Sequence, residues 1–162
     1  MKTVIRLGLL ILSISLLSSC KKEEDSNDTT PTLSTFLKGN FNITRTDYNG
    51  SLGTALGTAP VNGTGTSTSG SFLFESFTKT TTYLLSTNME VGSDSYPLYF
   101  GGAGTFQIVD ESSFSINDAI TGSTTYEVSS RTENSMVLSR GYDLDTLGGN
   151  ASLVLNLYLT KD

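Results

Sequence analysis

The chain has 162 residues, with 16 Asp or Glu and 10 Lys or Arg, which gives a formal net charge of −6. It contains no His, no Trp and one Cys, at position 20. These counts exclude a Ser-His-Asp triad, a Cys-His nucleophile pair, a Cys/His zinc site, a His-ligated haem and an internal disulfide.

The first 19 residues have the pattern of a secretory signal peptide. Two cations, Lys2 and Arg6, precede an apolar run over residues 7–17. A run of about eleven residues is too short for the hydrocarbon layer of a membrane, which needs about 20 apolar residues. We therefore expect residues 1–19 to be a cleaved signal peptide and not a transmembrane helix.

The end of this segment, Leu17-Ser18-Ser19-Cys20, resembles the lipobox of bacterial lipoproteins. The resemblance implies that the Cys20 thiol receives a diacylglyceryl group and that the new N-terminal amine is acylated, for example with palmitate. Two or three acyl chains anchor a protein stably, whereas one chain gives only marginal membrane binding. The alternative is a plain secreted protein whose cleavage site precedes a cysteine by chance.

Residues 20–33 are expected to form a lipidated, disordered tether, because residues 26–32 contain no apolar side chain. Lys22, Glu23 and Glu24 resemble the surface-export signal of Bacteroidota lipoproteins, which is a Cys, any residue, a Lys and two acids. The resemblance implies a protein anchored to the outer membrane and exposed at the cell surface. The alternative is a merely solvated tether and a periplasmic location.

Residues 34–162 have a length that suits one domain with one core. A short helical turn is expected within residues 32–39, because Thr32 or Ser34 can cap it and Gly39 can end it. Its apolar residues are placed to plug the end of a barrel. They are Leu33, Phe36 and Leu37.

Apolar and polar residues alternate through most of this domain and predict β-strands. In the last strand the leucines at 153, 155, 157 and 159 alternate with other residues, so they share one face. Eight to ten such strands, joined mostly by short connections, predict an all-β fold. Because such a sheet must hide its edges, we expect an antiparallel up-and-down barrel, with a two-sheet β-sandwich as the alternative.

Three glycine-containing segments are expected to connect strands. Asn49-Gly50 is typical of a hairpin turn, which makes Asp47 a turn residue. Gly101-Gly102 is expected to be another turn. Residues 62–70 contain no apolar side chain and are predicted to form the most mobile loop.

Gly39-Asn40-Phe41, at the start of the first expected strand, resembles the G-x-W motif that opens the lipocalin barrel, with Phe41 in place of the Trp. The tail, residues 126–162, resembles the last hairpins of lipocalin-like lipoproteins of the Bacteroidota. The resemblance implies a barrel with a central cup for a small apolar ligand. Lipocalins usually cover the Trp with an Arg from the last strand. Here the candidates for that role are Lys161, Arg140 and Arg131.

Two further patterns are interpreted as structural. Thr46-Asp47-Tyr48 spells the second lipocalin motif, but it lies too close to the first and is treated as a coincidence. Asp110 and Glu111 are adjacent, so we expect solvated turn residues and no catalytic pair.

Asp143 and Asp145 faintly resemble a calcium loop, but Leu147 stands where a third oxygen ligand belongs, so no metal site is expected. Thr29 and Thr146 each lie in a pattern that resembles the Bacteroidota O-glycosylation motif. Modification at either threonine is left open.

We expect a monomer that binds or carries a small apolar or amphipathic ligand, whose pocket residues remain unknown. The alternative is a non-enzymatic surface coat or protein-interaction module with a filled core, because inward-facing aromatic residues can fill a barrel as well as line a pocket. We expect no cofactor, no enzyme activity and no nucleic-acid partner, since phosphates require clusters of Lys and Arg. The inward-facing aromatic residues are Phe41, Phe72, Phe74, Tyr83, Phe100, Phe106, Phe114 and Tyr126.

Overall fold

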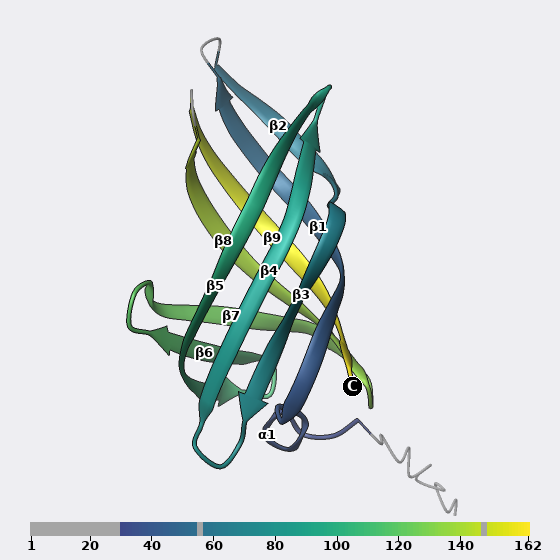
Figure 1. Ribbon diagram of the computed structural model, residues 1–162, viewed down its shortest axis with the longest axis vertical. Helices are drawn as coiled ribbons and strands as arrows, with labels where there is room; N and C mark the ends of the chain where they lie inside the picture. The colour runs from purple at the N-terminus through teal and green to yellow at the C-terminus, as the bar shows by residue number, and fades with distance from the viewer. Residues whose placement is uncertain (1–29, 55–56, 147–148) are drawn as a thin grey trace, which may run out of the picture.

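The computed structural model describes residues 30–54, 57–146 and 149–162, and these contain nine antiparallel strands and one short helix (Figure 1). The elements, in chain order, are α1 (Leu33–Phe36), β1 (Gly39–Thr54), β2 (Gly57–Thr64), β3 (Thr66–Glu75), β4 (Thr80–Val91), β5 (Asp94–Asp110), β6 (Ser113–Asp118), β7 (Gly122–Arg131), β8 (Ser135–Thr146) and β9 (Gly149–Lys161).

Eight of these strands form a closed barrel. Strands β3 to β9 neighbour one another in chain order, and β1 closes the ring by pairing with both β3 and β9. The remaining strand, β2, pairs with the second half of β1. The predicted all-β antiparallel barrel with a short N-terminal helical turn is therefore confirmed, and the β-sandwich alternative is not adopted.

The two ends of the barrel differ. Helix α1 lies at one end, here called the α1 end, and the last residues of β1, β4 and β8 lie at the other, here called the hairpin end (Figure 1). Strand β1 runs from the α1 end to the hairpin end and contains a β-bulge. Phe41 and Ile43 are buried, and so are Thr46 and Tyr48, because the register with β9 shifts between Ile43 and Arg45 and reverses the alternation.

Asn49-Gly50 is not a turn but lies in the middle of β1, so that prediction was wrong. Gly50 pairs with Val61 of β2 and Leu153 of β9. A Cβ at Gly50 would collide with the backbone of β9 at residues 152 and 153. The glycine is therefore explained by close approach of a neighbouring strand and not by a turn.

Asp47, expected as a turn residue, lies within the same strand. Its carboxylate accepts hydrogen bonds from Arg45 at 2.7 and 2.8 Å and from the Thr64 hydroxyl at 2.7 Å.

The two other predicted connections also lie in strands. Residues 62–70 belong to β2 and β3, and the Gly65 amide between them donates to the Thr46 carbonyl at 2.7 Å. Gly101 and Gly102 lie in β5, where a Cβ on Gly102 would collide with the carboxylate of Asp118 and approach the Tyr83 hydroxyl at 2.8 Å. Small residues here make room for packing inside the sheet.

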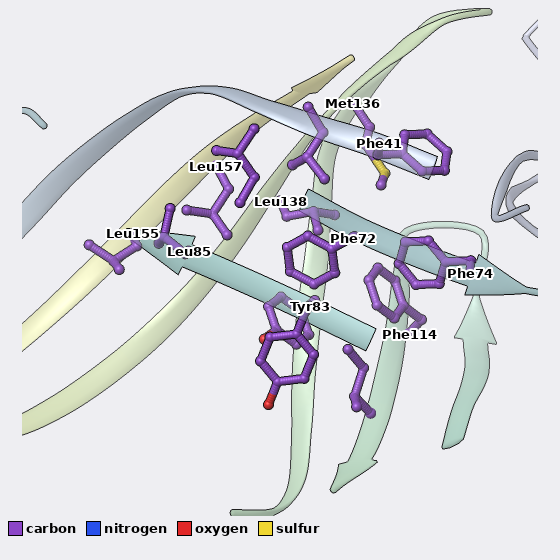
Figure 2. Packing of buried hydrophobic residues seen from close by; sticks show 14 of the residues in the cluster. Phe41, Phe72, Phe74, Tyr83, Leu85, Phe114, Met136, Leu138, Leu155 and Leu157 are labelled. Carbon is purple, nitrogen blue, oxygen red and sulfur yellow. The ribbon is translucent and has the colours of Figure 1, made fainter. Parts of the chain in front are cut away.

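Aromatic rings fill the barrel toward the α1 end (Figure 2). Phe72 stacks on Tyr83 with the ring centroids 5.5 Å apart, and Phe74 meets Phe114 edge-on at 5.5 Å. The largest fully buried rings are those of Phe36, Phe41, Phe72, Phe74, Phe114 and Tyr126. In this half of the barrel the inward-facing aromatic residues therefore pack against one another and fill the core.

Helix α1 plugs the α1 end, as its sequence predicted. Leu33, Phe36 and Leu37 are at most 1% exposed, and the Phe36 ring lies 5.2 Å from that of Phe41. Lys161 of β9 covers both rings, with Nζ 5.2 and 5.4 Å from their centroids, and donates to the Phe36 carbonyl at 3.3 Å. Of the three candidate cations, Lys161 is therefore the one that covers Phe41.

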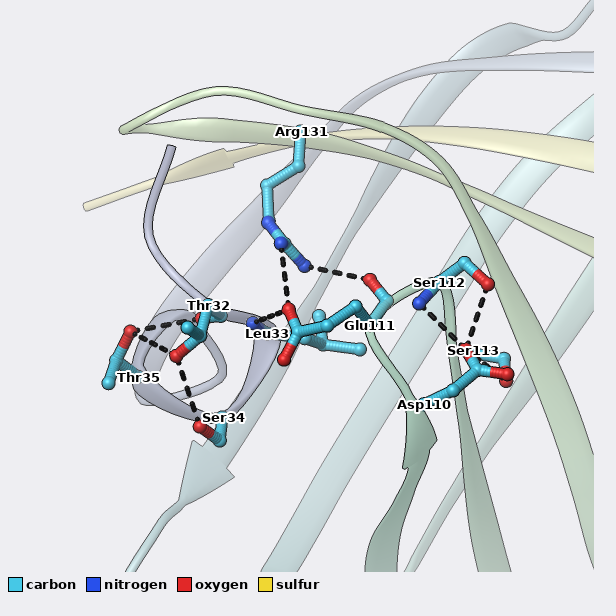
Figure 3. Close-up of polar contacts among 9 residues, drawn as sticks. All are labelled: Thr32, Leu33, Ser34, Thr35, Asp110, Glu111, Ser112, Ser113 and Arg131. Carbon is cyan, nitrogen blue, oxygen red and sulfur yellow. Dashed lines mark hydrogen bonds and ion pairs between the residues drawn. The ribbon is translucent and has the colours of Figure 1, made fainter. Parts of the chain in front are cut away.

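Glu111 fastens this plug to the turn between β5 and β6 (Figure 3). Its Oε2 accepts from the Leu33 amide at 2.8 Å and from Nη2 of Arg131 at 3.1 Å, and its carbonyl accepts from Nη1 of Arg131 at 3.2 Å. Thr32 holds the N-cap position without a side-chain cap hydrogen bond. Glu111 therefore caps the helix from a distant turn. Its side chain is 63% exposed, as expected for a turn residue, but it also makes these structural contacts, which the sequence did not predict.

Asp110, the neighbour of Glu111, is the exposed last residue of β5 and leads into the β5–β6 turn. Its Oδ1 accepts from the amide of Ser112 at 2.7 Å and from the hydroxyls of Ser112 and Ser113 at 2.8 and 3.0 Å. These bonds, led by that of the Ser112 hydroxyl, hold the pKa of Asp110 below its ordinary value. The two acids thus have separate structural roles.

Candidate functional site

The barrel wall is incomplete toward the hairpin end because the β6–β7 hairpin is short. β6 pairs only with residues 104–110 of β5, and β7 pairs only with residues 136–139 of β8. Residues 94–103 of β5 and 140–146 of β8 therefore have a strand partner on one side only. We call the gap between these two strand edges, above the low β6–β7 hairpin in Figure 1, the side opening.

Side chains, not backbone hydrogen bonds, connect the two edges. The rings of Phe100 on β5 and Tyr142 on β8 stack with centroids 4.6 Å apart. Arg140, two residues before Tyr142, places its guanidinium carbon 4.2 Å from the centroid of the Tyr142 ring and 5.3 Å from that of Tyr126. Its Nη1 donates to the Tyr126 hydroxyl at 2.9 Å. The side opening is thus crossed by a stacked cluster of aromatic rings and one cation.

A pocket of about 360 Å³ lies in the side opening. Its lining is mostly apolar, and polar groups come from three tyrosines, Thr121 and Arg140. The residues that line it are Tyr83, Pro97, Leu98, Tyr99, Phe100, Gly101, Thr121, Arg140, Tyr142 and Leu155. An apolar pocket with a few convergent polar groups is the usual form of a small-molecule site.

The hydroxyl of Tyr142 is buried and has no hydrogen-bond partner among the described residues. Burial first, and then the neighbouring Tyr126 phenol, raise the pKa of Tyr142. Burial likewise raises the pKa of Tyr126, against the opposing effect of Arg140. Both phenols therefore keep their protons at neutral pH and can act as hydrogen-bond donors.

Asp118 fixes the β6–β7 turn at the edge of the pocket. Its Oδ1 accepts from the amides of Ile120 at 2.7 Å and Thr121 at 3.2 Å, and its Oδ2 accepts from the Tyr83 hydroxyl at 3.4 Å. These bonds, led by that of the Ile120 amide, hold the pKa of the Asp118 carboxyl below its ordinary value. Thr121 and Tyr83, which both line the pocket, are thus positioned by one carboxylate.

Exposed apolar side chains lie beside the pocket. Tyr99, which lines it, is 73% exposed, and Ile120, next to Thr121, is 91% exposed. Leu84 on β4, paired with Gly101, is 43% exposed. The apolar character of the pocket therefore extends to the surface around the side opening.

The predicted site residues lie away from this pocket or outside the described part of the chain. Gly39 begins β1 with a φ of +85°, and Phe41 is fully buried beside the helical plug, so both belong to the α1 end. Cys20, the export signal of Lys22, Glu23 and Glu24, and Thr29 lie outside the described residues. So do Leu147 and the side chains of Asp145 and Thr146.

Sequence reasoning missed the pocket itself. Alternate residues of β8 face the inside of the barrel. Met136 and Leu138 begin this series, and Arg140 and Tyr142 continue it. A cation at an inward position of an otherwise apolar series is the signal that marks this site.

Comparison with known proteins adds no family to this description, since no family model and no curated sequence matches the chain. In the described ranges, no three acidic side chains gather where they could share a metal ion. The helix found there is too short to span a membrane.

Asp118 makes a testable contribution to stability. Because its pKa is lowered on folding, its stabilisation is present above the unfolded pKa near 3.8 and is lost as the pH falls through the folded value. We expect wild type to lose more stability than Asp118→Asn between pH 7 and pH values below about 3. Urea unfolding at both pH values measures this difference.

The matched control is Asp94→Asn, which changes an exposed residue on β5. It should follow wild type at both pH values. A constant gap between wild type and Asp118→Asn across the pH range would contradict the assignment.

Proposed function

We propose that the protein binds or carries a small amphipathic molecule in the pocket at the side opening. The observation that carries this proposal is the pocket of about 360 Å³ itself, in which an apolar lining converges with Arg140 and Tyr142. Ligand pockets occupy roughly 300–1,000 Å³, so this one suits a small ligand. The binding site proposed here differs from a central cup, because packed aromatic rings occupy the barrel toward the α1 end (Figure 2).

A protein-interaction module is the second candidate, and a specific observation favours it. The β5 edge along residues 94–103 carries backbone groups without a strand partner, and such edges can accept a strand from another protein. Pro97 lies on this edge and lacks an amide, a feature that blunts strand addition. The pocket behind the edge therefore supports ligand binding better than strand exchange.

We further propose that an acylated Cys20 anchors the protein to the outer membrane and that Lys22, Glu23 and Glu24 direct it to the cell surface. The proposal is supported by the lipobox resemblance and by the place where the described chain begins. Residue 30 leads into α1, so the tether would join the barrel at the α1 end (Figure 1). The hairpin end and the side opening would then remain accessible from outside.

Ligand binding can be followed with a tryptophan reporter, because the chain has no Trp. Phe100→Trp places a fluorophore in the pocket and retains an aromatic ring to stack on Tyr142. Titration with octanoate or 1-octanol should give a saturable change in emission, with a Kd of roughly 10 µM to 1 mM for ligands of about ten non-hydrogen atoms.

The control is Phe77→Trp in the turn between β3 and β4, where Phe77 is 98% exposed and absent from the pocket lining. This variant should give no saturable change. Absence of saturation for both probes in a folded Phe100→Trp variant would contradict the proposed function, as would an equal response from Phe77→Trp.

Anchoring and export are tested by separate variants. Cys20→Ser should move the protein from the detergent phase to the aqueous phase on phase separation, because the acyl chains are lost. Replacement of Lys22, Glu23 and Glu24 by alanine should keep the anchor but make the domain resistant to protease added to intact cells. Detergent partitioning of Cys20→Ser would refute the anchor, and digestion of the alanine variant would refute the export signal.

A further inference from the structure

We propose that Arg140 binds the carboxylate of a small amphipathic monocarboxylate, so that the pocket selects anionic over neutral and cationic ligands of the same shape. This inference rests on the proposed function and names the ligand class for that same pocket.

Arg140 forms no ion pair with a carboxylate of the described residues. The other described arginines form ion pairs, Arg45 with Asp47 at 2.7 Å and Arg131 with Glu111 at 3.1 Å, but no described carboxylate lies within 4.0 Å of Arg140. Its one hydrogen bond to a described residue goes to the neutral hydroxyl of Tyr126. A guanidinium has five N–H donors, so most of them remain available for a ligand.

The guanidinium is also held in place before any ligand arrives. The Arg140 guanidinium carbon lies over the rings of Tyr142 and Tyr126, 4.2 and 5.3 Å from their centroids. These contacts restrict the side chain, while a described residue uses only one of its N–H donors. A carboxylate binds a guanidinium along its N–H edge with two parallel hydrogen bonds, which a neutral hydroxyl cannot form. The arrangement therefore favours a planar oxyanion.

Tyr142 supplies a second donor in the same pocket. Its buried hydroxyl has no partner within hydrogen-bond distance among the described residues, a state that normally costs stability unless a ligand or water satisfies it. Arg140 and Tyr142 both line the pocket, so one ligand head group can reach both. A carboxylate has two oxygens and thus enough acceptors for the two side chains.

Asp118, the acid positioned at the pocket edge, does not offer an equivalent site for a cation. Its oxygens already accept from two backbone amides and from the Tyr83 hydroxyl. An ammonium ligand would have to compete with these bonds, whereas an anion finds donors on Arg140 that no described carboxylate occupies. The polar groups of the pocket therefore prefer negative charge.

The apolar part of the ligand has its own surface. Leu98, Phe100 and Leu155 line the pocket beside Arg140, and exposed Tyr99 extends this surface outward. A head group on Arg140 would leave a short hydrocarbon tail or an aromatic ring against these side chains. The pocket volume of about 360 Å³ limits that tail to a short one.

The test compares three probes of equal chain length, octanoate, 1-octanol and octylammonium, by fluorescence titration of the full domain carrying Phe100→Trp. We expect octanoate to bind at least about tenfold more tightly than either other probe, because hydrogen bonds to a charged group are worth more than neutral ones. Adding Arg140→Met should reduce octanoate affinity to about that of 1-octanol, and Arg140→Lys should retain part of the preference.

Arg45→Met is the matched control, since it removes an arginine that lies on β1 and outside the pocket lining. It should keep the full preference for octanoate. Equal binding of octanoate and 1-octanol, or tighter binding of octylammonium, would overturn the anion assignment while leaving the proposed function intact. If none of the three probes bound, the proposed function would fail as well. Should Arg140→Met not fold, the three-probe comparison without it still decides the question.

Discussion

The short β6–β7 hairpin is the constraint on which the rest of the structure depends. β6 has 6 residues and β5 has 17, so β6 can cover only part of its neighbour. The ring of hydrogen bonds is therefore complete at the α1 end and interrupted toward the hairpin end. An open sheet edge exposes apolar core and unpaired backbone groups. Here the side chains of Phe100, Tyr142 and Arg140 stack across the side opening and connect its two edges.

This interruption divides the barrel into two halves with different physical roles. At the α1 end the sheet is closed, aromatic rings pack edge to face, and a helix fastened by Glu111 covers the core. That half supplies the apolar burial on which a domain without disulfides depends. Toward the hairpin end, and within the described part of the chain, the Tyr142 hydroxyl has no hydrogen-bond partner and Arg140 has no carboxylate partner. Such unsatisfied groups are tolerated where they serve a site, because the packed half compensates for their cost.

Sequence patterns predicted the strands well, because alternation directly reflects which side chains face the core. The leucines of β9 at 153, 155, 157 and 159 are all buried, as their spacing indicated. Turns were predicted less well, since glycine is used both for turns and for close packing. Gly50 and Gly102 serve packing, and only their neighbours in space, from β9 and β6, reveal this. The role of Glu111 depends on a contact 78 positions away in the sequence, so local reasoning could not find it. The lipocalin resemblance made Arg140 a candidate to cover Phe41 at the α1 end. Arg140 instead lines the pocket, because it lies on the inward face of β8 two residues beyond the buried Leu138.

Backbone amide hydrogen exchange tests most directly whether the edges of β5 and β8 at the side opening are unpaired. In an edge strand, alternate amides point to the paired neighbour and to the open side. We therefore expect alternating slow and fast exchange along residues 94–103 of β5 and 140–146 of β8. Gly104 and Thr105 of β5 pair with both β4 and β6, and the Phe106 amide donates to the Lys79 carbonyl, so we expect slow exchange at all three amides. Uniformly slow exchange along the whole of β5 would mean that the edge is paired, and would contradict the account.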